Sequence, residues 1–327
     1  MFEKQNEIFK IQFEVQFEKI ALQIFRFQAK NNPVYKQFLK YLDTDLEKVL
    51  RVDEIPFLPI QFFKSHEVIS SKEKFEEVFM SSATTGVIPS KHYVTDVEFY
   101  QKSYLQGFQH FYGAIEEYTV LALLPNYLER KGSSLVFMVK DLIARSKSPD
   151  SGFYLHNLSE LSEKLIQLDQ KNQKVLLIGV SFALLDLLDF KEFALKKTII
   201  METGGMKGQR KEMIREELHE ILCSGFGVSK IHSEYGMTEL LSQAYSKGKG
   251  IFKTPPWMRV LIRDAEDALT ILPKGKTGGL NVIDLANVNS CSFIATQDLG
   301  KILPNGTFEI LGRFDNSDIR GCNLMVV

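Results

Sequence analysis

Strand-like apolar runs alternate with helix-like stretches between about residues 78 and 222, and this alternation constrains the fold more than any other feature of the sequence. The expected strands are Val78–Met80, Val120–Leu124, Val175–Val180 and Thr198–Met201. The expected helices between and after them span 96–112, 182–190 and 211–222. Strand–loop–helix alternation of this kind predicts an α/β fold, with a largely parallel sheet and helices on both of its faces.

The two ends of the chain differ from this middle part. The first 50 residues are predicted to be helical, because apolar residues recur at steps of three and four and form one stripe. The stripe consists of Phe9, Phe13, Phe17, Ile20, Ile24 and Phe27, and Asn31-Asn32-Pro33 is predicted to end the helix. From about residue 251, Pro and Gly punctuate short β-type runs. This texture predicts a small antiparallel sheet or barrel after a boundary near residue 250, with a type I′ turn at Asn305-Gly306.

Composition and charge argue against several classes of protein. Lys and Arg total 40 against 41 for Asp and Glu, and this net charge of −1 argues against broad binding to nucleic acid or to a membrane surface. The N-terminus MFEKQNEIFK has no signal-peptide apolar region, and the longest uncharged runs are about half a membrane span. Three Cys without a CxxC pattern give no metal or disulfide framework. We therefore expect a cytoplasmic protein, whose 25 Phe fill the core or line a pocket for an apolar ligand.

A loop rich in hydroxyl groups is the first candidate site. It reads SSATTGVIPSK from Ser81 to Lys91 and follows a strand-like run. Hydroxyls and backbone N–H groups of such a loop can wrap phosphate oxygens, and Lys91 would add a cation. The loop lacks the GxxxxGK[ST] pattern of a Walker A motif. An ordinary solvated loop is the alternative.

Two further segments place glycine and polar groups directly after expected strands. Tyr235-Gly-Met-Thr-Glu239 combines an aromatic ring, a hydroxyl and a carboxylate, which suit a base, a phosphate and Mg²⁺ respectively. Alternatively, it is a strand-to-helix turn with Glu239 in the first helical turn. In Glu202-Thr-Gly-Gly-Met206 the paired glycines let a planar ligand approach the backbone, and an ordinary turn is the alternative.

Two segments near the end of the chain complete the set. Asp298, in ATQDLG, carries a carboxylate that can accept hydrogen bonds from ribose hydroxyls, although a surface aspartate is equally ordinary. The last segment, GRFDNSDIRG, runs from Gly312 to Gly321. Each segment is unspecific by itself, and the order of all five along the chain is the informative feature.

In this order the segments resemble the adenylate-forming superfamily of acyl-CoA synthetases, luciferases and peptide-synthetase adenylation domains. The superfamily reads [ST]SGTTGxPK, YGxTE, TGD and GRxDxxIKxxG, where this chain has SSATTGVIPSK, YGMTE, TQDLG and GRFDNSDIRG. Ala83 replaces the usual Gly of the first motif, and an extra residue stands near Pro89. Within the superfamily, the chain is most similar to the acyl-protein synthetase (LuxE-type) family of bacterial fatty-acid reductase components. That similarity rests on residues 56–64, 235–245 and 320–325.

The resemblance implies the large N-terminal α/β domain of an adenylate-forming enzyme, with parallel sheets flanked by helices and a small β-rich subdomain. It divides the chain into an α/β core over 1–250, a β-rich subdomain over 251–313 and a hinge-like tail over 314–327 that carries Cys322. The superfamily's C-terminal domain, with its catalytic Lys, is expected to be lacking, because the sequence stops at Val327, soon after the hinge position Asp315. We expect either the large domain alone or a partner to complete the reaction.

The resemblance also implies roles for individual residues, with ATP and Mg²⁺ as cofactors. The expected ATP-binding residues are Ser81, Ser82, Thr84, Thr85, Gly86, Gly204, Gly205, Met206, Tyr235, Gly236, Asp298 and Arg313. The expected catalytic residues are Lys91 on the phosphates, Thr238 on the α-phosphate, Glu239 on Mg²⁺ and Cys322 as the acyl-accepting thiol.

The activity implied by the family is conversion of a carboxylic acid, most simply a long-chain fatty acid, to its acyl adenylate, followed by acyl transfer to Cys322. A reductase is the expected recipient of the acyl group, and an acyltransferase is a further expected partner. Two alternatives stay open: a free-standing ligase that uses CoA or a carrier-protein thiol, and a non-catalytic acyl- or nucleotide-binding subunit of a reductase complex. Cys223 and Cys291 stand in apolar surroundings and are expected to be packing residues.

Overall fold

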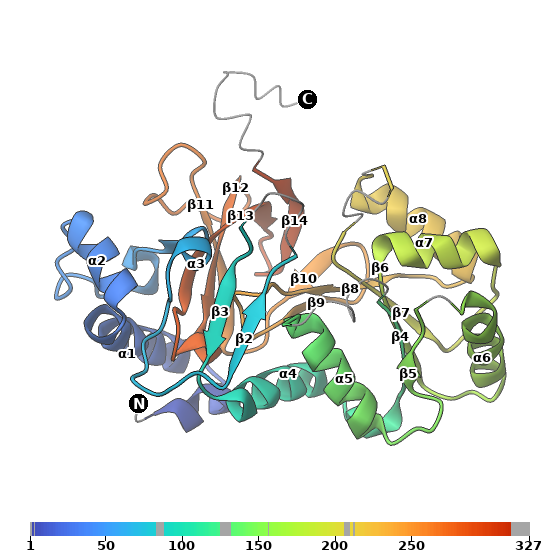
Figure 1. Ribbon diagram of the computed structural model, residues 1–327. Helices are drawn as coiled ribbons and strands as arrows, with labels where there is room; N and C mark the ends of the chain where they lie inside the picture. The colour runs from blue at the N-terminus through green and yellow to red at the C-terminus, as the bar shows by residue number, and fades with distance from the viewer. Residues whose placement is uncertain are drawn as a thin grey trace.

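The computed structural model describes residues 2, 4–82, 88–124, 132–155, 157–205, 210–211 and 213–314, which fold into helices packed on β-sheet (Figure 1). The α-helices are α1 (Glu14–Asn31), α2 (Pro33–Tyr41), α3 (Phe62–Ser65), α4 (Val97–Tyr112), α5 (Ser134–Ser146), α6 (Leu158–Gln170), α7 (Ser181–Phe190) and α8 (Arg215–Phe226). The 3-10 helices are η1 (Gln5–Lys10), η2 (Val52–Glu54), η3 (Ile115–Glu117) and η4 (Leu285–Asn287). The strands are β1 (Leu58–Pro59), β2 (Glu77–Met80), β3 (Lys91–Val94), β4 (Thr119–Leu123), β5 (Gly152–Phe153), β6 (Val175–Val180), β7 (Ile199–Thr203), β8 (His232–Tyr235), β9 (Ala244–Ser246), β10 (Ile251–Lys253), β11 (Met258–Arg263), β12 (Thr277–Asp284), β13 (Phe293–Ile302) and β14 (Phe308–Arg313).

One 12-stranded sheet joins most of these strands. Its order is β11-β12-β13-β14-β10-β9-β8-β7-β6-β4-β5, and β1 adds a short parallel pairing to β13. Strands β5, β4, β6, β7 and β8 pair in parallel. From β8 to β9 and on to β11, each neighbouring pair is antiparallel. The sheet therefore changes its mode of pairing at β8, a short strand in its middle.

The parallel half of the sheet has helices on both faces. From β4 the chain goes to β5 at the edge of the sheet, and it then passes β4 to form β6, β7 and β8 in the opposite direction. Because such crossovers are right-handed, α5 lies on one face of the sheet and α6, α7 and α8 lie on the other. Figure 1 shows α5 and α6 on opposite sides of β4 and β5. The predicted α/β fold is confirmed, and the strands expected at 120–124, 175–180 and 198–201 are found to within two residues.

Two expectations for this region differ from the structure. The run Val78–Met80 lies in β2, but β2 pairs antiparallel with β3 in a separate two-stranded sheet. Parallel pairing needs a crossover of a dozen residues or more, whereas the loop between β2 and β3 simply returns the chain. The helix expected over 211–222 is α8, which begins at Arg215 and ends at Phe226, and Gly227 is its left-handed C-cap with φ 71°.

The prediction of one apolar stripe from Phe9 to Phe27 is wrong at its start. Phe9 lies in η1, and Phe13 is the extended residue before α1, where it is 66% exposed. The Gln16 side chain accepts a hydrogen bond from the Phe13 N–H, which starts α1 there. The stripe does hold inside α1, because Phe17, Ile20 and Ile24 are buried, and the predicted end of the helix at Asn31 is confirmed.

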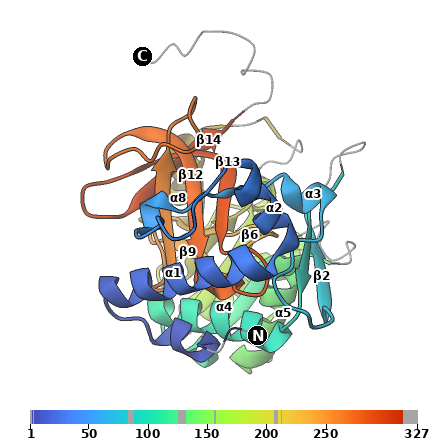
Figure 2. The same cartoon turned by 90° about the vertical axis from the view of Figure 1, so that its left-hand side faces the viewer.

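Helix α1 lies across the antiparallel half of the molecule, as Figure 2 shows. Its buried Gln28 donates hydrogen bonds to the carbonyls of Asn287 and Val288, at 3.1 and 2.9 Å, and accepts one from the Ser292 N–H. These bonds tie the N-terminal helix to the chain between β12 and β13. In the described part of the chain, the helices include none with the length and apolar content needed to cross a bilayer.

The antiparallel strands expected after residue 251 are present as β10 to β14. The predicted type I′ turn at Asn305-Gly306 is wrong. The Gly306 N–H donates to the Leu303 carbonyl at 2.9 Å, so Pro304 and Asn305 are the central residues of the turn. A type I′ turn needs a positive φ at both central positions, but the ring of Pro304 fixes its φ near −65°. Within this turn only Gly306 has a positive φ, of 84°.

Candidate functional site

The glycine turn after β7 and the aromatic segment after β8 lie side by side. The two strands are parallel neighbours in which Thr203 is opposite Glu234, so Gly204 and Tyr235 follow at the same edge of the sheet. Gly204 has φ 70°, in the left-handed region that favours glycine. A side chain at Gly205 would meet only open space, so the backbone of this turn is accessible to a ligand. Carboxyl ends of parallel strands are where ligands bind in α/β sheets.

A buried carboxylate joins three of the predicted residues. The Tyr235 hydroxyl donates to Asp298 Oδ2 at 2.7 Å, and Arg313 Nε donates to Asp298 Oδ1 at 2.9 Å. Arg313 and Asp298 are directly opposite one another in the β13–β14 pairing. Burial raises the pKa of Tyr235 well above its usual value, and the charge of Asp298 raises it further. Tyr235 is therefore a neutral hydrogen-bond donor, and the Asp298 charge is balanced mainly by Arg313, whose side chain is 75% exposed.

The hydroxyl-rich loop is closed at its base by two hydrogen bonds. The Ser81 N–H donates to the Ser90 carbonyl at 3.0 Å, and the Ser90 N–H donates to Ser81 Oγ at 2.9 Å. Lys91 is the first residue of β3 and is exposed, with Met80 opposite it. Ser82 is also exposed. These two bonds hold the ends of the loop together, and the Lys91 side chain follows directly at its second end.

Glu239 lies against the base of this loop. Its side chain is hydrogen-bonded with Ser90, and only 6% of the residue is exposed. Burial raises the pKa of Glu239, while the charge of Arg313 lowers it. The charges that act on Glu239 are those of Arg313 and Asp298, which have opposite signs. One carboxylate with substrate phosphates is a common way for proteins to hold Mg²⁺, and Glu239 fits that pattern.

The turn that carries Thr238 and Glu239 is held by residues that the motifs did not reveal. His92 Nδ1 is 2.8 Å from the Thr238 carbonyl oxygen, and Asn287 Nδ2 donates to the Glu239 carbonyl at 2.7 Å. Asp284 accepts bonds from the N–H groups of Leu241 and Ser242, at 2.8 and 2.9 Å. The only sequence signal for Asp284 is a carboxylate at the end of an apolar strand. Residues 236–243, all of which the structure describes, form no helix between β8 and β9, so the alternative that places Glu239 in a first helical turn is wrong.

Two carboxyl groups, the buried Glu202 and the partly buried Glu234, lie directly below the glycine turn. The Thr203 hydroxyl donates to Glu234 Oε2 at 2.5 Å. Burial raises the pKa of Glu234 to about 7, and the charge of Glu202 adds to the increase. Glu202 Oε1 lies 3.6 Å from Arg215 Nε and 3.5 Å from His219 Nε2. Gly236 is close-packed here, because a Cβ at this position would stand 2.5 Å from Glu234 Oε1.

Five of the predicted site residues lie outside the described part of the chain: Thr84, Thr85, Gly86, Met206 and Cys322.

The two remaining cysteines are described, and burial disfavours the thiolate form of both. Cys291 has no exposed surface, and burial raises the pKa of its thiol to about 12. Cys223 is partly buried, and burial raises its pKa too. Both are shielded as packing residues are.

The fold is that of an adenylate-forming enzyme. ATP-bound MatB from Rhodopseudomonas palustris is similar to this chain with a TM-score of 0.55 and 18% sequence identity, over 75% of this chain and 49% of MatB. 2-Hydroxyisobutyryl-CoA ligase, in an open conformation with 2-HIB-AMP and CoA, is similar with a TM-score of 0.65 and 12% identity, over 93% of this chain and 70% of the ligase. This chain therefore spans about half the length of MatB.

Sequence comparison gives the family. The profile of the family "Acyl-protein synthetase, LuxE" matches residues 136–327, more than half of the chain. The chain belongs to this acyl-protein synthetase family, and the predicted membership is confirmed. A search of curated proteins found no match.

Proposed function

We propose that this protein uses ATP to convert a carboxylic acid to its acyl adenylate and then transfers the acyl group to a protein thiol. The observation that carries the proposal is a chain of contacts between four segments that are far apart in the sequence. Ser90 contacts Glu239, and Tyr235, Asp298 and Arg313 are joined by hydrogen bonds. The charges of Arg313 and Asp298 also act on Glu239. Phosphate-loop, metal-binding and ribose-binding roles are thus assigned to residues that lie together.

In the first step, a carboxylate oxygen of the acid attacks the α-phosphorus of ATP, the bond to the β-phosphate oxygen breaks, and pyrophosphate leaves. Lys91 and the loop that begins at Ser81 would neutralise the phosphates, and Thr238 would contact the α-phosphate. Mg²⁺, held by Glu239, would supply further positive charge to the phosphates. Tyr235 and the glycine turn would hold the adenine, while Asp298 and Arg313 would hold the ribose. These contacts would orient the α-phosphate for in-line attack.

In the second step, a thiolate attacks the acyl carbonyl carbon, the bond from that carbon to the AMP oxygen breaks, and AMP leaves. The thiol must first give up its proton. Burial opposes this at Cys223 and Cys291, which supports Cys322 as the acceptor. A long-chain fatty acid is the proposed substrate, a reductase is the proposed recipient of the acyl group, and an acyltransferase is a further proposed partner. A cytoplasmic location belongs to the same proposal.

Labelled fatty acid, ATP and Mg²⁺, incubated with the full chain, test both steps. We expect label on the protein that neutral hydroxylamine releases, and we expect Cys322→Ala to lose it. Cys223→Ala is the matched control, because it removes a shielded thiol, and it should keep the label. Label that persists on the Cys322→Ala protein would exclude the thioester at Cys322.

The same assay separates the two alternatives. Release of pyrophosphate without protein labelling, with acyl-CoA formed when CoA is added, would identify a free-standing ligase. This alternative has some support, since the similar 2-hydroxyisobutyryl-CoA ligase was captured with CoA. Absence of pyrophosphate exchange with every carboxylic acid tested would leave a non-catalytic binding subunit.

A further inference from the structure

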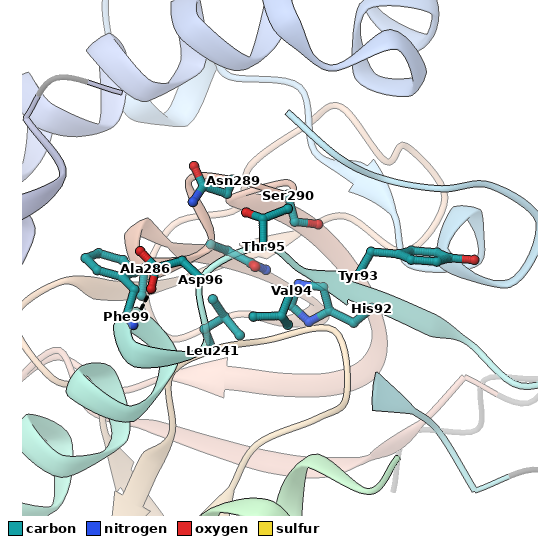
Figure 3. Close-up of a pocket in the computed structure, with 11 residues that line it drawn as sticks. His92, Tyr93, Val94, Thr95, Asp96, Phe99, Leu241, Ala286, Asn289 and Ser290 are labelled. Carbon is teal, nitrogen blue, oxygen red and sulfur yellow. Dashed lines mark hydrogen bonds between the residues drawn. The ribbon is translucent and has the colours of Figure 1, made fainter. Parts of the chain in front are cut away.

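A small pocket is lined in part by His92 and Asn287, the two residues whose side chains hold the Thr238–Glu239 turn. It lies between β3 and the chain after β12, and His92, Thr95, Leu241, Asn287 and Asn289 are among the residues that line it. Figure 3 shows His92, Thr95 and Asn289 arranged around this space, whereas the Tyr93 ring points away from it. The volume of the pocket is about 10 Å³, which is the space that one water molecule needs.

Four polar atoms on the residues that line this pocket have no hydrogen-bond partner among the described residues. They are His92 Nε2, Thr95 Oγ1, Asn287 Oδ1 and Asn289 Oδ1. None of the four residues is more than 9% exposed. A buried polar atom without a partner is costly, and His92 Nε2, Asn287 Oδ1 and Thr95 Oγ1 beside one small space indicate a shared partner.

The bonds already present define what this partner must be. The Thr238 carbonyl can only accept, so His92 Nδ1 carries the ring proton and Nε2 presents a lone pair. Asn287 uses its Nδ2 group on the Glu239 carbonyl, so its Oδ1 is also an acceptor. The side chains of His92 and Asn287 lie within hydrogen-bonding reach of one another, but they meet as two acceptors with no proton between them. The missing partner must donate twice, and a water molecule is the smallest group that does so.

We propose that one ordered water in this pocket donates to His92 Nε2 and Asn287 Oδ1, accepts from the Thr95 hydroxyl, and makes His92 a positioning residue for the Thr238–Glu239 turn. The water satisfies His92 Nε2 in the tautomer that the Thr238 carbonyl requires, with the proton on Nδ1. Together His92 and Asn287 hold two successive carbonyls, which sets the direction of the Thr238 hydroxyl and the Glu239 carboxylate. The catalytic consequence rests on the proposed function, whereas the hydrogen-bond arrangement does not.

Paired substitutions at His92 separate positioning from packing. The side-chain amide of Asn reaches about the place of Nδ1, and that of Gln about the place of Nε2. His92→Gln is therefore expected to lower kcat for pyrophosphate exchange about tenfold or more, with a smaller change in the KM for ATP, because the turn is misplaced. His92→Asn should recover activity to within about threefold of wild type.

His232 supplies the matched control. It is also a buried histidine with a pKa lowered to about 4 by burial, but its Nδ1 pairs with the Tyr112 hydroxyl, away from the turn. His232→Asn should keep the wild-type kcat even where it lowers stability. Equal kcat values for His92→Gln and His92→Asn, or a loss in His232→Asn as large as in His92→Gln, would overturn the positioning role.

A crystal structure of the full chain tests the arrangement without reference to activity. We expect one water within about 3 Å of His92 Nε2 and Asn287 Oδ1, and its loss or displacement in Thr95→Val. A dry pocket, or a direct hydrogen bond from Asn287 to His92 Nε2, would overturn the proposal even if the enzyme assay succeeds. If wild type shows no pyrophosphate exchange, the proposed function fails, and the water and the His92 tautomer are still decided by this structure.

Discussion

The carboxyl group of Glu234 allows a quantitative test of the electrostatics beside the site. Burial raises its pKa from the usual 4.5 to about 7, and the charge of Glu202 adds to this increase. The folded protein therefore keeps a proton on Glu234 at pH values where the unfolded chain has lost it. Glu234→Gln removes the titration but keeps an oxygen that can accept from the Thr203 hydroxyl.

The sign and the size of the effect follow from linkage. Below about pH 4.5 the carboxyl is protonated in both states, and above about pH 7 it is ionised in both, so stability changes only between these values. In that interval the unfolded state alone releases the proton, and the wild type loses about 1.4 kcal/mol per pH unit, or roughly 3 kcal/mol in all. We expect about 2–3 kcal/mol, because Glu234 is not fully removed from solvent. The Gln variant lacks this loss, so its stability relative to wild type rises by that amount as pH increases.

Urea unfolding at about pH 4.5, 6, 7 and 8 measures the free energies of unfolding of both proteins. Glu220→Gln is the matched control, because Glu220 is an exposed residue of α8, and its difference from wild type should not change over this range. A difference between Glu234→Gln and wild type that stays constant to within about 0.5 kcal/mol would refute the reasoning. It would mean that Glu234 ionises as freely in the folded protein as in the unfolded chain.

Three further perturbations test the site. Glu239→Gln should lower pyrophosphate exchange by about 10²-fold, and more than Cys322→Ala does, because the thiol is needed only after the adenylate has formed; equal residual rates would contradict these roles. Tyr235→Phe should cost about 1–3 kcal/mol of unfolding free energy, because it removes a buried donor from Asp298, and an unchanged urea midpoint would argue against that bond. Gly204→Ala should cost about 1–2 kcal/mol, since φ is 70°, and an unchanged melting temperature would contradict this.

The parts of the fold that depend on local pattern could be predicted from the sequence. β6 has the predicted bounds, because its six residues are continuously apolar and all are buried. Phe13 marks the limit of such reasoning. Its spacing matches a helical stripe, but the hydrogen bond from its N–H to Gln16 begins the helix one residue later and leaves the ring in solvent. The prediction of a type I′ turn at Asn305-Gly306 was wrong for a similar reason, because the preceding Pro304 already determines the turn type.

In the candidate site, motif order indicated residues that the structure brings together, whereas it gave no sign of the residues that hold them in place. Motif order indicated Tyr235, Glu239 and Asp298, each of which lies in the observed cluster. His92 reaches Thr238 across 146 positions in the sequence, and Asn287 reaches Glu239 across 48. Such contacts are set by how β3 and the loop after β12 pack together. Neither periodicity nor a local motif predicts these long-range contacts, so they become visible only in the structure.

The change in pairing at β8 explains why these segments meet where they do. β7 and β8 run in parallel, so their carboxyl ends bring the glycine turn and Tyr235 to one edge. β9 then returns antiparallel beside β8, which forces residues 236–243 to turn back at that same edge. Because β13 and β14 belong to the antiparallel half of the same sheet, Asp298 and Arg313 reach Tyr235 from the other direction. The turn that carries Thr238 and Glu239 therefore lies between the parallel and the antiparallel half of the sheet. Its Thr238 and Glu239 carbonyls pair with the side chains of His92 and Asn287, which lie outside the turn. The His92 substitutions measure how much the hydrogen bond to the Thr238 carbonyl contributes to kcat by positioning Thr238 and Glu239.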